Sequence, residues 1–413
     1  MRLLISFAAL FLSVIFLQLS SGVVGPLDAI SGSTLGFATE QIGLLGSAHF
    51  LGFFIGCWWA PRLIGGIGHS RAFATFTALG AIGLIAHMII VDPYAWALMR
   101  IGSGMCIAGA YTVVEAWLQA KLTNENRGRA MGTYRVVDMG ASLAAQVMVG
   151  VLEPASYVSY NLLAIICCAA ILPLTLSRAS PPETPLAPRL RPMIAIALSP
   201  LGATAVVVAG LTSAAFRMVG PVYGQEIGLS LAEIGYFLAA FVAGGAAAQY
   251  PVGWLADKYD RRTLMIWLSA AAVASCAVTV LLGATSPQAA IASAALFGFT
   301  TFPIFSIASA HANDFATSEQ RVELSAALMF LFAVGAIGSP LGASYVIDAF
   351  GPSALFLMIA VAHLLLVAVG LLRNLVGRVS ETRTRYVYAP RTSFLIGRLL
   401  SRQREVADDP KKP

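Results

Sequence analysis

The sequence predicts an all-α integral membrane protein with twelve transmembrane helices in two pseudo-symmetric bundles of six. Of its 413 residues, 58% are hydrophobic and only 11% are charged, which is too apolar for a water-soluble domain. Apolar runs of about 20 residues, the length that a bilayer core requires, alternate with short polar breaks along nearly the whole chain. Lys and Arg occur in every second break, which is the positive-inside pattern and places both chain ends in the cytoplasm.

The first bundle is predicted over residues 1–176. Its spans are expected at 3–24, 42–60, 72–91, 95–118, 130–151 and 157–176. The first apolar run is too long for a signal peptide, so it counts as a span. The connections on the basic side carry Arg62, Arg71, Lys121, Arg127 and Arg129. Those on the other side carry only acids, namely Asp28, Glu40, Asp92 and Glu153.

Residues 177–197 contain five prolines and three arginines and are predicted to form a cytoplasmic linker. A second bundle follows over residues 198–372, with spans at 198–222, 234–254, 264–282, 288–313, 324–347 and 352–372. Its basic connections carry Lys258, Arg261, Arg262 and Arg321, and its acidic ones Glu226, Glu233 and Asp348. Residues 373–413 form a basic cytoplasmic tail with ten Lys and Arg, whose apolar stretch is suited to the membrane surface.

The two halves resemble each other weakly. Residues 67–71 match residues 258–262 at an offset of about 192, and the sequence around Arg127 matches that around Arg321 at an offset of 194. Two matches at nearly one offset indicate a duplicated six-helix unit. In a membrane protein built from two such units, a binding site is expected near the midplane, where the units face each other.

Five charged residues fall within the predicted spans: Arg100, Glu115, Arg135, Asp138 and Arg217. A buried charge in a membrane is costly, so each is a candidate for a functional site. Arg135 and Asp138 share a helix face, which favours a structural pair, although Asp138 is also a candidate proton carrier. Glu115 has no partner on its own helix, which favours a proton-carrying role. Arg217 requires an acid across the cavity or a solute carboxylate.

Two further polar residues, Gln249 and His311, complete the predicted solute and proton pathway. His311 lies near the inner end of a helix, and a histidine there can titrate near neutral pH. Interhelical hydrogen bonding is the alternative role for both residues.

The segment GWLADKYDRR, residues 253–262, closely resembles the cytoplasmic G-x-L-A-D-R-x-G-R-R motif of the major facilitator superfamily. The resemblance implies a cytoplasmic gate. Gly253 is expected to let helices approach, and Asp257 to sit on the positive end of the fifth helix and latch the outward-facing state. The basic members of the predicted gate are Lys258, Arg261, Arg262, Arg127 and Arg321. A basic loop that serves only membrane topology is the alternative.

RIGSG, residues 100–104, resembles the fourth-helix motif of the same superfamily, which implies that Arg100 serves proton coupling or binds an anionic group. A structural pair with an acid on another helix is the other interpretation. Residues 113–132, 220–237, 249–262 and 302–315 are similar to the YcaD-like bacterial branch of the superfamily. The resemblance implies the twelve-helix fold and secondary transport by alternating access.

The predicted function is therefore secondary active transport of a small solute across the bacterial inner membrane, coupled to protons. The chain contains no zinc spacing, phosphate-binding glycine loop or nucleophile elbow, so we predict no enzyme activity, catalytic residue, metal or cofactor. The expected partners are the solute, protons and the lipid bilayer, with no nucleic acid, and the chain is expected to be a monomer. The alternatives are a multidrug efflux pump and a non-transporting sensor or scaffold that signals through the tail.

Overall fold

The computed structural model describes residues 2–122, 127–175, 191–317, 320–376, 384 and 386–389. Within these ranges the chain forms helices and no strand, which confirms the all-α prediction. The helices are α1 (Arg2–Thr34), α2 (Thr39–Ile67), α3 (His69–His87), α4 (Pro93–Lys121), α5 (Arg127–Val149), α6 (Tyr157–Ala169), α7 (Ile171–Thr175), α8 (Pro192–Leu198), α9 (Pro200–Glu226), α10 (Leu231–Lys258), α11 (Arg261–Leu282), α12 (Pro287–Thr301), α13 (Ile304–Asn313), α14 (Arg321–Phe350) and α15 (Ala354–Val376).

Ten segments of the described chain are long and apolar enough to cross a membrane. Two of them are built from consecutive helices, α6 with α7 and α12 with α13. The second pair is broken at Pro303, which has no N–H to continue the hydrogen-bond ladder of the helix. Helices α3 and α5 are not among the ten. The protein is thus a multi-pass membrane protein, and the count of twelve spans stays a prediction for α3 and α5.

The largest error in the predicted boundaries concerns the first span. The first span was expected to end at Val24 because Asp28 was assigned to an outward connection, but α1 continues to Thr34 and Asp28 is only 1% exposed. Its carboxylate has one hydrogen bond and two ion-pair contacts with side chains from three other helices, so the acid does not end the helix. Helix α8 occupies the last part of the predicted linker, most of which lies outside the described residues.

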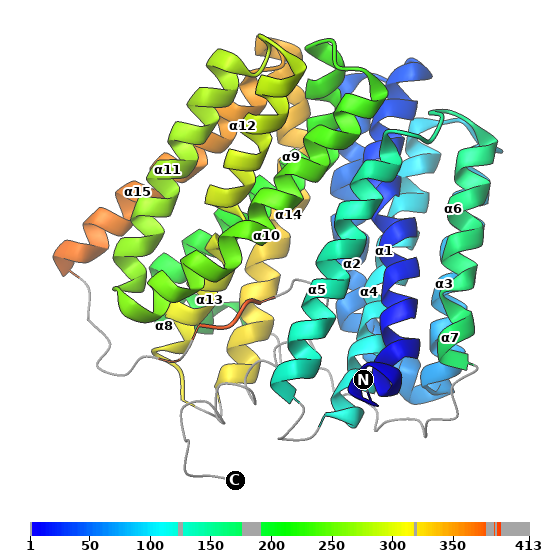
Figure 1. Ribbon diagram of the computed structural model, residues 1–413, viewed down its shortest axis with the longest axis horizontal. Coiled ribbons are helices and arrows are strands. Elements are labelled where there is room, and N and C mark those ends of the chain that lie inside the picture. Colours follow the sequence, from blue (N-terminus) through cyan, green and yellow to red (C-terminus); the bar gives the residue numbers. More distant parts are fainter. Residues whose placement is uncertain are drawn as a thin grey trace.

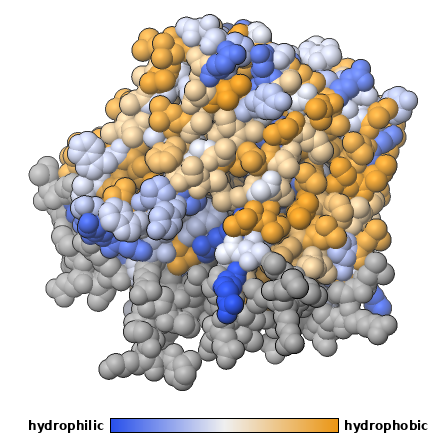
Figure 2. All heavy atoms as spheres, in the orientation of Figure 1, coloured by the Kyte–Doolittle hydropathy of each residue, from blue (hydrophilic) through white to orange (hydrophobic). Residues whose placement is uncertain are grey.

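The helices form two groups that lie side by side, α1–α7 in one and α8–α15 in the other (Figure 1). The start of α1 and residues 386–389, drawn in red, lie toward the same end of the molecule, which we call the termini side, and the opposite end is the far side. Hydrophobic residues cover most of the face seen in Figure 2, while hydrophilic residues gather toward the two ends. This distribution is expected of a protein whose middle part is surrounded by lipid and whose two ends face water.

The two groups approach closely on the far side. A Cβ atom added to Gly43 of α2 would lie 2.6 Å from the carbonyl oxygen of Pro340 in α14, and the backbone N–H of Leu341 donates to Ser47 Oγ at 3.2 Å. Gly150, after α5, and Gly235 of α10 form a second close approach, where a Cβ added to Gly235 would lie 2.8 Å from the Gly150 nitrogen. Glycine is required at such places because any side chain would separate the helices.

Candidate functional site

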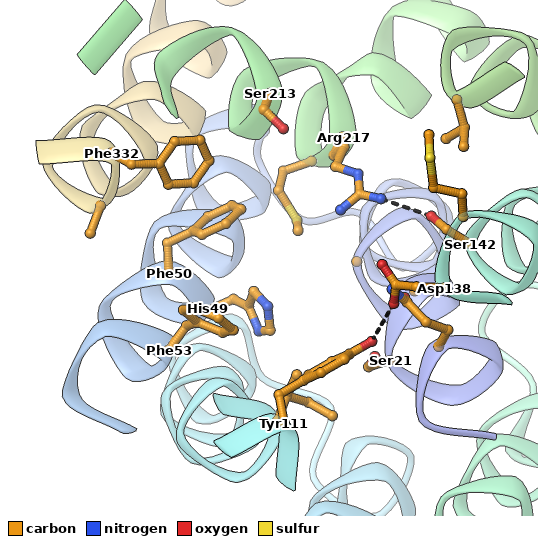
Figure 3. A pocket seen from close by; sticks show the side chains of 18 of the residues that line it. Ser21, His49, Phe50, Phe53, Tyr111, Asp138, Ser142, Ser213, Arg217 and Phe332 are labelled. Atoms are coloured by element: carbon orange, nitrogen blue, oxygen red, sulfur yellow. Dashed lines mark hydrogen bonds between the residues drawn. The ribbon is translucent and has the colours of Figure 1, made fainter. Parts of the chain in front are cut away.

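A cavity of about 160 Å³ lies between the two groups of helices (Figure 3). Helices α1, α2, α4 and α5 contribute to its wall from one group, and α9, α10 and α14 from the other. Its polar lining consists of Gln18, Ser21, His49, Tyr111, Asp138, Ser142, Gln146, Ser213 and Arg217. A polar cavity shared by two helix groups is the arrangement that the internal repeat predicts.

Asp138 of α5 belongs to a hydrogen-bond network that joins three helices. Gln18 Nε2 of α1 donates to its Oδ1 atom at 2.8 Å, and the hydroxyl of Tyr111 in α4 donates to the same atom at 3.1 Å. The two donors fix the carboxylate on the cavity wall, and its second oxygen accepts neither bond. The carboxylate can therefore take a proton or a donor from a solute without losing its position.

Arg217 of α9 reaches across from the other group of helices. Its Nη2 atom donates to Ser142 Oγ of α5 at 3.0 Å. A guanidinium has five N–H donors, so this bond leaves several for a solute. Arg217 and Asp138 lie on the same side of the cavity (Figure 3), and their charges interact. Asp138 is thus a neighbouring acid on the same wall, and whether Arg217 also pairs with a solute carboxylate stays a prediction.

The opposite side of the cavity is aromatic. Phe50 and Phe53 of α2 and Phe332 of α14 face the polar side (Figure 3), and Phe54 of α2 packs edge-on against Phe330 at 5.4 Å between ring centres. The cavity thus offers one charged wall and one apolar wall. An amphipathic solute can satisfy both.

Arg100 does not line this cavity. It is buried in α4, with its Nε atom 3.5 Å from Oδ2 of Asp28 in α1. The His87 Nε2 atom lies 3.4 Å from the same oxygen, and the Tyr160 hydroxyl donates to the other oxygen at 2.7 Å. Of the two interpretations of Arg100, the structure thus contains the pair with an acid on another helix. Asp28 also corrects the expectation that Glu115 and Asp138 are the only acids within the spans.

Two residues of the predicted pathway also lie away from the cavity. Glu115 of α4 is fully buried and accepts a hydrogen bond from the Tyr134 hydroxyl at 3.3 Å. His311 of α13 is 8% exposed and packs edge-on against Phe315 at 5.2 Å. Their place in a proton pathway stays a prediction.

Arg135 and Asp138, expected to pair on α5, have different surroundings. The guanidinium of Arg135 lies 5.5 Å from the ring centre of Tyr388, a residue of the C-terminal tail. Arg135 and Gln249 of α10 line a second cavity, of about 520 Å³, between α5 and α10 on the termini side. Gln249 Oε1 accepts a hydrogen bond from the hydroxyl of Tyr386, also in the tail, at 3.1 Å.

In the predicted gate, Arg261 is the central residue. It is 3% exposed, and its Nη1 atom lies 2.6 Å from Oδ1 of Asp314, which follows α13. Its Nη2 atom lies 3.4 Å from Asp257 Oδ1. Asp257, whose side chain is 48% exposed, also accepts from the backbone N–H of Tyr386 at 2.6 Å. Asp257 therefore holds the tail in this structure, and its latch on α5 stays a prediction.

The other predicted gate residues have separate roles. Arg262 is 8% exposed and donates to the Arg373 carbonyl at 3.3 Å, while the Lys258 ammonium lies 4.8 Å from the Trp254 ring centre. Gly253 was expected to let helices approach each other. In the structure it makes room for the tail instead, because a Cβ atom there would lie 2.8 Å from the Tyr386 ring. Arg321 begins α14, and Arg127 begins α5 with a side chain outside the described part of the structure.

The sequence profile of the Major Facilitator Superfamily matches residues 201–403, about half of the chain. The chain is 27% identical over 355 residues to the uncharacterized MFS-type transporter YcaD of Salmonella arizonae, covering 84% of this chain and 90% of that protein. It is also 27% identical over 324 residues to an uncharacterized MFS-type transporter of Enterobacter sp. (strain 638), covering 78% and 84%. The chain belongs to the major facilitator superfamily. Its members are transporters and not enzymes.

Solved structures of this superfamily share the fold. The nucleoside transporter NupG superposes with a TM-score of 0.70 at 15% identity, covering 90% of this chain and 99% of that one. A bacterial homologue of the lysosomal transporter Spinster, in an inward-facing and unoccupied conformation, gives 0.68 at 14% identity, covering 96% and 97%. The D-xylose–proton symporter gives 0.64 at 11%, covering 88% and 96%. The major facilitator fold is thereby confirmed.

Sequence analysis missed three parts of the transporter's polar interior. Asp28 was taken for a loop acid, although the apolar residues after it would have allowed a longer α1. Tyr111 was not singled out because a tyrosine in an apolar helix gives no signal of its own. Asp314 was not assigned to the gate, because its partner Arg261 lies 53 residues away in the sequence. No group of three or more metal-ligating side chains occurs among the residues that the structure describes.

Proposed function

We propose that this transporter carries a small solute across the bacterial inner membrane by alternating access, as a monomer whose two six-helix bundles, residues 1–176 and 198–372, rock around the central cavity. One observation carries the proposal: Arg217 and Asp138, from different bundles, line the same cavity at the bundle interface. Charged groups at membrane depth are stable where they face water or one another. A solute bound between them contacts both moving bodies.

The positive-inside pattern supports a cytoplasmic assignment for the termini side. Close contacts such as Gly43 with Pro340 then seal the periplasmic side, and the space between α5 and α10 opens to the cytoplasm. The conformation is accordingly inward-facing. The fold similarity to an inward-facing Spinster homologue is in keeping with this assignment.

The lining favours a small zwitterionic or anionic solute with an apolar part. A carboxylate would accept charge-assisted hydrogen bonds from Arg217, and an ammonium group would approach Asp138. The aromatic wall, formed by Phe50, Phe53 and Phe332, would cover the apolar part. Nucleosides and D-xylose, the solutes named for two solved relatives, carry no carboxylate. Nucleosides and pentoses are therefore the alternative solute classes to a carboxylate-containing solute.

Proton coupling is assigned to Asp138. A proton on this carboxylate removes the negative charge beside Arg217 and so changes what the cavity offers a solute. Because Gln18 and Tyr111 hold the carboxylate in place, its protonation alters charge with little movement. Asp28 and Arg100 form a separate buried ion pair that does not line the cavity and that stabilises the packing of the first bundle.

The solute class is tested by a thermal-shift screen of purified protein against amino acids, organic acids, nucleosides and pentoses. A ligand that binds only the folded state raises Tm by mass action. We expect carboxylate-containing compounds to raise Tm in the wild type and Arg217→Gln to weaken their binding about 10- to 150-fold, since hydrogen bonds to charged groups contribute about 1.5–3 kcal/mol. Arg62→Gln, at an exposed arginine of α2, is the matched control.

Coupling is tested by uptake of the strongest ligand from that screen into proteoliposomes with an imposed pH gradient. The wild type and the control Arg62→Gln should respond to the gradient, and Asp138→Asn should not. A pentose or nucleoside that stabilises Arg217→Gln as well as the wild type would overturn the charged-solute assignment. Uptake by Asp138→Asn that still follows the gradient would overturn the coupling role.

A further inference from the structure

Part of the C-terminal tail lies inside the termini-side opening. Thr384 and residues 386–389, which we call the C-terminal strap, run beside α13 (Figure 1, red). Thr384, Val387 and Ala389 are 7%, 6% and 4% exposed, and the last two pack in the apolar core of the termini side. The tail was expected to lie on the membrane surface; the strap does not, and residues 390–413 lie outside the described part of the chain.

The strap begins on the gate. The backbone N–H and the hydroxyl of Thr384 both donate to Asp314 Oδ1, at 2.9 and 2.8 Å. Arg261 donates to the Thr384 carbonyl and, at 3.2 Å, to its hydroxyl. Thr384 thus forms hydrogen bonds with both residues of the buried ion pair between Arg261 and Asp314.

Tyr386 continues the strap along α10. Its backbone N–H donates to Asp257 and its hydroxyl to Gln249, so one residue spans more than two turns of the helix. The ring lies over Gly253, where the smallest possible side chain leaves room for it. Burial raises the pKa of Tyr386, which keeps the hydroxyl protonated as a donor.

The end of the strap connects the two groups of helices. The backbone N–H of Ala389 donates to Ser306 Oγ of α13 at 3.1 Å. The ring of Tyr388 faces Arg135 of α5, and it lines both the central cavity and the cavity between α5 and α10. The strap therefore occupies the way from the termini side to Asp138 and Arg217.

We propose that the C-terminal strap is an intramolecular ligand of the termini-side opening, which blocks access to the central cavity and prevents α5 and α10 from closing on each other. Buried backbone groups must find partners, and the strap finds them on Asp257, Asp314 and Ser306. Asp257 cannot act as a latch on α5 while the strap holds it. If the protein transports a solute as proposed, a strap in the opening inhibits that transport. The claim that the strap occupies the opening does not depend on the proposed function.

Access to the cavity tests the proposal without a substrate. Met139→Cys places a thiol where the two cavities meet. The background is Cys57→Ser with Cys168→Ser, because Cys57 lines the central cavity and Cys168 is exposed. Its labelling rate with a maleimide is measured in the purified chain ending at Val376 and in the full chain. A strap in place about nine-tenths of the time lowers access about tenfold, so truncation should speed labelling by at least that factor.

Three variants make the test specific. A chain ending at Pro390 keeps the strap and should label at the full-length rate. Gly253→Ala, which displaces the Tyr386 ring, should label faster than the full chain. Tyr386→Phe loses only the hydroxyl, so its labelling rate should lie between those of the full chain and Gly253→Ala. Equal labelling of all these chains would overturn the proposal. Faster labelling of the strapless chain together with no uptake of any screened compound would refute the transport function and leave the strap in place.

Discussion

The close approach of Gly43 and Pro340 allows the conformational equilibrium to be shifted by one methyl group. Gly43→Ala would put a Cβ atom 2.6 Å from the Pro340 carbonyl oxygen, and closer still to Ser344 Oγ. The serine can rotate, but the carbonyl belongs to the backbone of α14. Van der Waals contact needs about 3.5 Å, so α2 and α14 must separate by about 1 Å. We expect the variant to favour the state in which the far side is open.

The size of the effect follows from overpacking, which costs about 1–3 kcal/mol in a close-packed interface. This cost applies only while the far side is closed. Since 1.4 kcal/mol is a factor of ten, the ratio of far-side-open to far-side-closed molecules should rise roughly 5- to 150-fold. The strap opposes the same change, so the shift should be larger in the chain ending at Val376.

Spin labels measure this shift as a distance. Ala38, before α2, and Phe350, at the end of α14, are exposed positions in different groups on the far side. With labels at both in the Cys168→Ser background, Gly43→Ala should increase the population with the longer separation. The control is Gly342→Ala on α14, where a Cβ meets nothing within 4 Å. Identical distance distributions in the two variants would refute the reasoning.

Two further predictions concern stability. Arg100→Gln leaves the buried Asp28 carboxylate without its cation and should cost about 3 kcal/mol, which for a chain of this length lowers Tm by about 3–4 °C. The double variant Arg100→Gln with Asp28→Asn should recover part of the lost Tm. An unchanged Tm in Arg100→Gln alone would show that the ion pair does not contribute to stability. Gly52→Ala would force the backbones of α2 and α4 apart and should lower Tm by about 1–3 °C. Gly102→Ala, where a Cβ meets nothing, is its control, and equal melting of the two would contradict the packing argument.

The sequence was sufficient for ten of the membrane spans and for the fold class, because hydropathy and the positions of basic residues report directly on membrane crossings. Its largest boundary error, the end of α1, arose because Asp28 was considered without its partners. A carboxylate with three partners from other helices costs far less to bury than an isolated one, and those partners lie 59 to 132 residues away. Hydropathy contains no information on such partners.

The candidate site was predicted only in part for the same reason. Arg217 and Asp138 do line the cavity, whereas Arg100 and Glu115, equally prominent in the sequence, face neighbouring helices. Which face of a helix meets the cavity depends on packing between helices. The strap could not be foreseen, since a polar and aromatic stretch in a basic tail gives no signal for a partner inside the molecule.

The covalent attachment of the strap has a quantitative consequence. Residues 377–383 join it directly to α15, so its local concentration at the opening is set by a short tether and is on the order of millimolar. A free peptide of the same sequence, at micromolar concentration, would hardly compete with it. Intrinsic affinity between strap and opening can accordingly be weak, and a small chemical change in either surface is enough to release it.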